Sequence, residues 1–167
     1  MAQFQTALAQ EVLGSFVPTC IPPAKIPFQV HSTKIGKQFA GLCSEMLKGQ
    51  GWKLYGPAKI KELGVSVNQV GYSKSGKKFY FQFSGSFNGK TPGLHRFNSF
   101  KQILGTTYLI REFDKTPTIV LTSHRPNRFT AGDAATAVTT KKGVLKGVYS
   151  VFDGNDVASL KNIVDFE

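Results

Sequence analysis

The chain has 167 residues and 41% of them are hydrophobic, which is enough for one packed domain, residues 1–167, without a structural metal or a disulfide framework. Its two cysteines and three isolated histidines match no paired metal-ligand spacing, so we expect no metal and no cofactor. No apolar run approaches the roughly 18 residues of a membrane span, so we expect an intracellular protein, cytoplasmic or nucleoid-associated, with no membrane partner.

The formal net charge is +11, and the positive charge lies in the body of the chain. Residues 1–152 hold 20 lysines and arginines against six acids, whereas residues 153–167 hold four acids and one lysine. Between Glu62 and Glu112 there is no carboxylate at all. Such an excess of cations cannot be neutralised locally, and it favours a polyanionic partner through counterion release.

The N-terminal region is expected to begin with a helix. Residues 3–15 place apolar side chains at helical spacing, and Pro18 ends the pattern. Three prolines between Cys20 and His31 then favour an extended connection, with a short edge strand at Phe28–Val30.

A second helix is predicted after Thr33, which can cap it, and it ends at Gly49. We expect Cys43 to be a reduced core residue on its buried face. A short helical turn is expected to follow Pro57 and to end at Gly64. The apolar stripe of the second helix consists of Ile35, Phe39, Leu42, Cys43, Met46 and Leu47.

The pattern then changes to the two-residue period of strands. Val65–Tyr72 and Lys77–Phe87 are expected to form a hairpin around the loop at residues 73–76. Residues 92–104 return to helical spacing, which predicts one helix inserted after the hairpin.

The C-terminal part is expected to contain two more pairs of strands and a final helix. The first pair is Thr106–Phe113 with Thr118–His124, and the second is Ala134–Thr140 with Val144–Phe152. After Asp153, apolar residues at helical spacing predict a helix to the end of the chain.

These elements predict an α+β fold. Its main part would be an antiparallel sheet or a small barrel of five to eight strands, with N-terminal helices, one inserted helix and a C-terminal helix. A single jelly roll is also compatible if the extended segments near Phe28 and Trp52 join the sheet. The sequence pattern does not distinguish between an open sheet, a small barrel and a jelly roll.

The segment 78–83 is the most suggestive one for function. Alternation places Phe79, Phe81 and Phe83 on one face of a strand and the intervening residues on the other face. Aromatic rings that stack on bases beside cations that hold phosphates are typical of single-strand binding. The alternative is that the three Phe residues fill the core and Tyr80 is an ordinary surface residue.

The sequence therefore predicts a sequence-tolerant binder of single-stranded DNA or RNA, of a kind that would suit a phage or virus. Trp52 and Phe129 are further candidates for stacking on bases. The predicted contact residues are Tyr72, Lys74, Lys77, Lys78, Tyr80, Lys90, Arg96, Lys101, Arg111, Arg125, Arg128, Lys141 and Lys142.

Two other functions stay open. A viral capsid or coat subunit would turn a basic face to the genome and form a homo-oligomer in the virion. We do not expect an enzyme, but a metal-independent ribonuclease could use the pairs His95–Arg96 and His124–Arg125 with Glu112. That reading needs one of these histidines within reach of a second titrating group.

Overall fold

The computed structural model describes residues 28–85 and 93–166. Contacts divide the chain into two units, residues 1–34 and residues 35–167. The description below concerns the second unit and helix α2, whose residues belong partly to each unit. The helix expected at residues 3–15 lies outside the described residues, and the expectation of a single domain stays a prediction.

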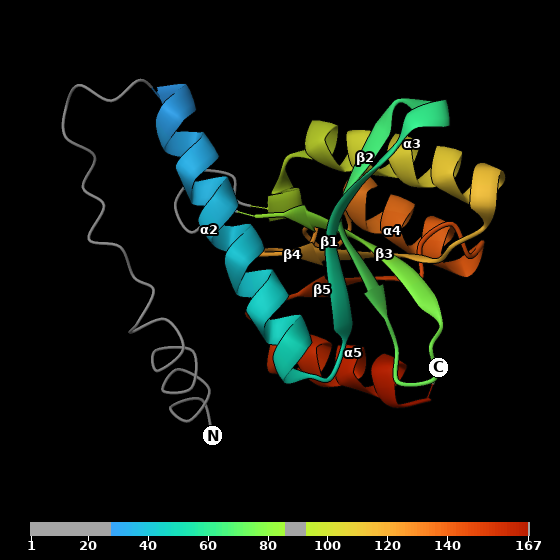
Figure 1. Ribbon diagram of the computed structural model, residues 1–167. Helices are drawn as coiled ribbons and strands as arrows, with labels where there is room; N and C mark the ends of the chain where they lie inside the picture. Colours follow the sequence, from blue (N-terminus) through green and yellow to red (C-terminus); the bar gives the residue numbers. More distant parts are fainter. Residues whose placement is uncertain (1–27, 86–92, 167) are drawn as a thin grey trace. The chain divides into compact units, whose positions relative to one another are not determined.

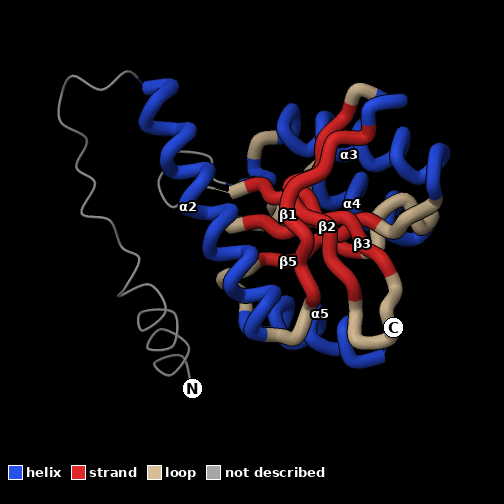
Figure 2. The backbone as a smooth tube through the Cα atoms, viewed as in Figure 1, coloured by secondary structure: helices blue, strands red, loops and turns tan. Residues whose placement is uncertain are grey.

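Five strands form one mixed sheet in the order β1-β2-β3-β4-β5, with helices on both faces (Figures 1 and 2). Strands β1, β2 and β3 pair antiparallel, whereas β3, β4 and β5 pair parallel. The elements are α2 (Phe28–Gly49), β1 (Lys53–Ile60), the 3₁₀ turn η1 (Lys61–Leu63), β2 (Val65–Tyr72), β3 (Lys78–Ser84), the 3₁₀ turn η2 (Gly93–His95), α3 (Phe97–Asp114), β4 (Thr118–Thr122), α4 (Ala131–Lys141), β5 (Gly147–Ser150) and α5 (Gly154–Phe166).

The core has two halves, one on each face of the sheet. On one face, α2 and α5 cover Phe79, Phe81, Ile119 and Leu121, and Trp52 packs edge-on against both phenylalanines at 5.2 and 5.0 Å between ring centroids. On the other face, α3 and α4 cover β4 and β5. The alternative in which the phenylalanines fill the core is therefore confirmed for Phe79 and Phe81, and Phe83 packs partly buried against the same cluster.

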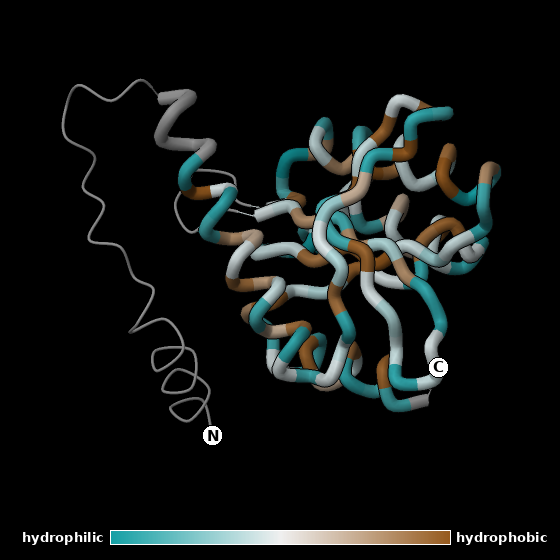
Figure 3. Tube along the Cα trace, in the orientation of Figure 1, coloured by the Kyte–Doolittle hydropathy of each residue, from teal (hydrophilic) through white to brown (hydrophobic). Residues whose placement is uncertain are grey.

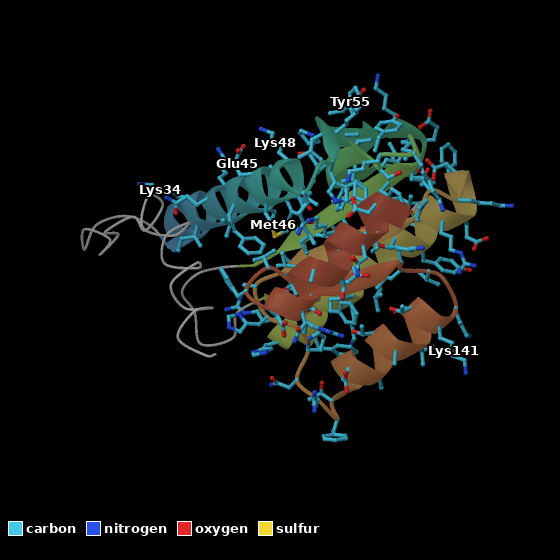
Figure 4. The ribbon with its side chains drawn as sticks, turned by 90° about the horizontal axis from the view of Figure 1, so that it is seen from below. Lys34, Glu45, Met46, Lys48, Tyr55 and Lys141 are labelled. Carbon is cyan, nitrogen blue, oxygen red and sulfur yellow. The ribbon has the colours of Figure 1, made fainter. Side chains whose placement is uncertain are left out.

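Helix α2 confirms the predicted second helix and its end at Gly49, but the expected start at a Thr33 cap is wrong, because the helix already begins at Phe28. Four residues of its apolar stripe are buried, and hydrophilic and hydrophobic residues alternate along the helix (Figure 3). Glu45 and Lys48 project outward while Met46 points toward the sheet (Figure 4). Cys43 is buried with a free thiol, and burial raises its pKa. The buried residues of the stripe are Ile35, Phe39, Cys43 and Leu47.

The edge strand expected at Phe28–Val30 is wrong, because α2 already begins at Phe28. From Phe28 to Gly49 the helix contains no proline, so no backbone N–H is missing from it.

The helical turn expected between Pro57 and Gly64 is also largely wrong, since only Lys61–Leu63 is helical, as a 3₁₀ turn. Residues 53–60 form β1, which pairs with β2 and shifts register on both sides of Gly56. Strand β1 is an edge strand, where a proline and a bulge are both tolerated.

The largest corrections concern two expected strands that are helical. The segment Thr106–Phe113 is the second half of α3, with Thr107 and Ile110 buried at helical spacing from Phe100. The segment Ala134–Thr140 lies in α4, where the hydroxyls of Thr136 and Thr139 donate to carbonyls four residues earlier. Packing and these local bonds outweigh the preference of β-branched residues for strands.

Because α3 and α4 replace those strands, β3, β4 and β5 are joined by helical crossovers and run parallel. The expected barrel and jelly roll are therefore wrong, whereas the α+β class and the C-terminal helix are confirmed.

The predicted strand pair Val65–Tyr72 and Lys77–Phe87 is confirmed as β2 and β3, and Thr118–His124 is confirmed as β4, within a residue or two over the described residues. The expected strand Val144–Phe152 is confirmed only at Gly147–Ser150.

Candidate functional site

The three parallel strands end at the same edge of the sheet, and the chain leaves this edge toward η2 and α3, toward α4 and toward α5. We call the segments 93–96, 122–130 and 150–156 the carboxyl edge. The segments 72–78, 111–117 and 141–147 lie at the opposite end of these strands, which we call the amino edge. In open α/β sheets, ligands bind outside the carboxyl ends of the strands.

Close backbone contacts hold two segments of the carboxyl edge together. The N–H of Leu94 donates to the carbonyl of His124 at 2.9 Å. The Thr122 hydroxyl donates to the carbonyl of Ser84 at 2.7 Å and accepts from the N–H of His124 at 3.3 Å. Gly93 has a φ of +57°, and a Cβ there would lie 2.6 Å from the Thr122 hydroxyl and 2.7 Å from the His124 nitrogen. Only glycine fits at position 93 without displacing its neighbours.

This contact brings two histidines together. The rings of His95 and His124 meet edge to face with centroids 5.3 Å apart, and the ring of Phe152 lies 6.4 Å from that of His124. Partial burial lowers the pKa of His124 below its ordinary value, and the charge of His95 lowers it further. His124 is therefore held in its neutral form at neutral pH.

A titration of the histidine side chains by NMR should give His124 a midpoint below its usual value of about 6.5. Replacing His95 with Gln removes the facing charge, so the midpoint of His124 should rise. Because the folded protein binds this proton less readily than the unfolded chain does, protonation of His124 should also lower stability as the pH falls below about 6.5. An unchanged midpoint in H95Q would contradict the coupling of the two rings.

An acidic residue holds one arginine in place. One oxygen of Asp156 lies 3.1 Å from Nη1 of Arg125, and its other oxygen accepts from the N–H of Ser150 at 2.7 Å. The Ser150 hydroxyl donates to the carbonyl of Ser123 at 3.0 Å. Asp156 is buried, whereas the Arg125 side chain keeps 49% of its surface exposed. The guanidinium is thus positioned on one side and accessible on the other.

The loop between β4 and α4 presents an exposed ring. Phe129 is 99% exposed and has a φ of +63°, a conformation that bulky side chains rarely adopt. Its N–H donates to Oδ2 of Asp133 at 3.0 Å, and Thr130 caps α4 by accepting from the N–H of Asp133 at 3.4 Å. Strained residues persist where the surroundings fix them, and they cluster at binding sites.

A shallow open pocket of about 270 Å³ lies between the end of β3 and α3. Its lining is neutral and mainly polar, and includes Gln82, Ser99 and Gln102. These groups offer hydrogen bonds but no charge, so the pocket suits an uncharged part of a ligand.

The predicted contact residues divide between the two ends of the sheet. Arg96, Arg125 and Arg128 lie at the carboxyl edge, and Lys101 follows in the first turns of α3, with its Nζ 4.8 Å from the centroid of the Phe97 ring. Lys90 lies outside the described residues. At or beside the amino edge lie Tyr72, Lys74, Lys77, Lys78, Arg111, Lys141 and Lys142.

Two cations of the amino edge are engaged with acids. Lys74 forms an ion pair with Asp165, and Lys78 lies 3.8 Å from Asp114. Burial lowers the pKa of Lys78, but its hydrogen bond with Tyr80 and the charge of Asp114 outweigh burial and raise it. These lysines already have partners, so they offer less charge to a ligand than their number indicates.

Tyr80 requires a correction, because the face of β3 that it shares with Gln82 was expected to meet bases. Tyr80 is only 5% exposed, Gln82 is buried, and the Tyr80 hydroxyl donates to Asp114 at 2.9 Å. Helix α3 covers this face through Ile110. A central strand with helices on both faces has no solvent face, so Tyr80 cannot stack on a base here.

Trp52 is also buried, and the ring of Tyr72 packs edge-on against Tyr55 at 5.1 Å. Glu112 lies near the end of α3, at the opposite end of the sheet from His95 and His124. The expected combination of histidine and Glu112 is therefore not assembled.

Sequence reasoning missed the role of Asp156, which gives no local signal, since its partner Arg125 is 31 residues away. It named the two His–Arg pairs together with Glu112, and the structure brings the rings of His95 and His124 together without Glu112. The repetition of the His–Arg dipeptide was the signal for this pairing.

Within residues 28–85 and 93–166, no three His, Cys, Asp or Glu side chains gather closely enough to hold a metal ion. In the same part of the chain, no helix has the length and apolar character needed to cross a membrane. Comparisons with models of protein families, with curated proteins and with solved structures gave no match. The residues of the carboxyl edge are therefore the basis for assigning a function.

Proposed function

We propose that this protein binds single-stranded nucleic acid at its carboxyl edge. The observation that carries the proposal is that three loops, far apart in sequence, bring three arginines, two histidines and two exposed rings to the ends of β3, β4 and β5. Cations that contact phosphates beside rings that stack on bases are the combination that sequence-tolerant single-strand binding requires. The groups concerned are His95, Arg96, His124, Arg125, Arg128, Phe129 and Phe152.

The arginines supply the phosphate contacts. Arg125 is oriented by Asp156, so less side-chain entropy is lost when it binds a phosphate. Helix α3 begins directly after Arg96 with no side-chain cap and no acid in its first turn. Its N-terminal N–H groups therefore add to the positive potential of this edge.

The rings supply contacts that do not depend on base identity. Phe129 has nearly all of its surface free, and Phe152 is also exposed. A base stacked on an aromatic ring contributes about 1 to 3 kcal/mol whatever its identity. The polar pocket between β3 and α3 offers hydrogen bonds to an uncharged group of the same strand.

The test is binding of a labelled strand of about 30 nucleotides, and of the matching duplex, across a salt series. We expect preferential binding of the single strand, with an affinity that falls steeply as salt rises. Arg128→Ala should weaken binding uniformly across sequences and reduce the salt slope by about 1.

Lys141→Ala is the matched control, since Lys141 is an exposed cation at the end of α4, on the amino edge (Figure 4). It should change the affinity and the salt slope less than Arg128→Ala does. Equal losses in both variants would indicate diffuse attraction to a basic protein, and weak binding by large assemblies would instead favour the coat-subunit alternative.

A further inference from the structure

We propose that His95 and His124 form an acid–base pair that cleaves bound RNA at the carboxyl edge. This inference rests on the proposed function, since the RNA must first bind there. The two rings come from different loops and meet with centroids 5.3 Å apart. Two imidazoles this close can serve one phosphodiester together, one at the attacking oxygen and the other at the leaving oxygen.

Backbone contacts fix the positions of the two histidines relative to each other. The carbonyl of His124 accepts from Leu94, the residue directly before His95, and its N–H donates to the Thr122 hydroxyl. Gly93 lies against the backbone N and O of His124, closer than a residue with a Cβ could. Phe152 packs against the His124 ring from the third loop. Catalytic groups need this kind of positioning from rigid elements.

The reaction is a transfer of the phosphodiester to the neighbouring ribose hydroxyl. Neutral His124 accepts the proton of the 2′-hydroxyl, and O2′ attacks phosphorus as the bond from phosphorus to O5′ breaks. Protonated His95 donates its proton to the departing O5′. The products are a 2′,3′-cyclic phosphate and a 5′-hydroxyl, and proton exchange with water restores both histidines. The step consumes no oxidant, reductant or other co-reactant.

The surrounding charges fit these roles. Arg125 follows His124 directly and can stabilise the extra negative charge on the phosphoryl oxygens in the transition state. Partial burial and the facing charge keep His124 in the neutral form that a base needs. The other charged groups near the pair are Arg96 beside His95, Asp156 on Arg125, and Asp153 after Phe152. A base and an acid of this kind give a bell-shaped dependence of rate on pH.

The experiment uses the full chain, a chelator, and an end-labelled RNA of about 20 nucleotides beside the DNA of the same sequence. We expect RNA fragments that end in a 2′,3′-cyclic phosphate, and DNA that is bound but not cut because it lacks the 2′-hydroxyl. His124→Gln and His95→Gln should each lower the cleavage rate about 100-fold or more at saturating RNA, with RNA affinity changed no more than about threefold. Lys141→Ala should cleave at the rate of the unaltered protein.

Each other outcome is decisive. RNA that binds but stays intact would overturn the acid–base pair and leave the proposed binding function standing. Absence of binding would overturn both proposals. Equal cleavage of DNA, or equal cleavage by the histidine variants, would show that the activity does not come from this pair. Circular dichroism would show whether the glutamine variants have lost their fold. If they have, the dependence of the cleavage rate on pH in the unaltered protein tests the proposal instead. A flat dependence would overturn the acid–base pair.

Discussion

Gly93→Ala is expected to lower the free energy of unfolding by roughly 2 to 4 kcal/mol. Two effects add. The φ of +57° is unfavourable for any residue with a Cβ, and that Cβ would lie 2.6 to 2.8 Å from the Thr122 hydroxyl and from the backbone N and O of His124. Backbone atoms cannot turn away as the end of a flexible side chain can. The contact that positions His124 is therefore the part of the fold that must shift.

Gly143→Ala is the control, because Gly143 has a φ of +65° but a Cβ there would meet nothing within 4 Å. Gly143→Ala adds only the unfavourable positive φ and no close contact, so it should lower the free energy of unfolding by about 1 kcal/mol. Denaturant titration of both variants separates the two contributions. Equal losses would mean that the contact with His124 relaxes at no cost, and the His95–His124 geometry would then not depend on Gly93.

Much of the fold could be predicted from local patterns where one face of an element is buried. The stripe of α2, the strands β2 and β3, and helix α5 all follow the period of their secondary structure. For α2, β2 and α5 burial follows the same period that the sequence shows, so the pattern is sufficient. Strand β3 is buried on both faces, so its alternation predicted the strand but not its burial.

Prediction failed where local preference and packing disagree. Residues 106–110 are rich in threonine and aliphatic side chains and favour a strand, yet they continue α3 because Thr107 and Ile110 lie on its buried face. The same holds for the threonines of α4, whose hydroxyls bond to the helix itself. One such error changes the connection between two strands, so the sheet was predicted to be antiparallel although half of it is parallel.

The candidate site depends on that connection, which is why the sequence could name its residues without grouping them. Arg96, Arg125 and Arg128 lie at the same edge because crossover helices return each parallel strand to that edge. In a chain of hairpins successive loops alternate between the two ends of the sheet, so the loops that carry these arginines would not have shared one edge. The sequence also placed Tyr80 on a solvent face that a central strand with two covered faces does not have.

Phe129→Gly is expected to weaken binding of single strands while it stabilises the fold, two effects that ordinary loss of structure cannot produce together. Removing the ring removes one stacking surface, so affinity should fall by about 1 to 2 kcal/mol, or roughly 5- to 30-fold. Glycine accepts the φ of +63° without strain, so the free energy of unfolding should rise by up to about 1 kcal/mol. Fluorescence anisotropy and denaturant titration of the same sample measure both changes.

Two controls separate the ring from the backbone. Phe129→Tyr keeps the ring and the strained conformation, so affinity and stability should both stay close to those of the unaltered protein. Lys115→Gly relieves the other positive φ of a non-glycine residue in the described chain, +58° at the end of α3, and should stabilise the fold with little effect on affinity. If Phe129→Gly stabilised the protein but bound single strands as tightly as before, the Phe129 ring would have no part in stacking, and the carboxyl edge would bind through its charges and Phe152.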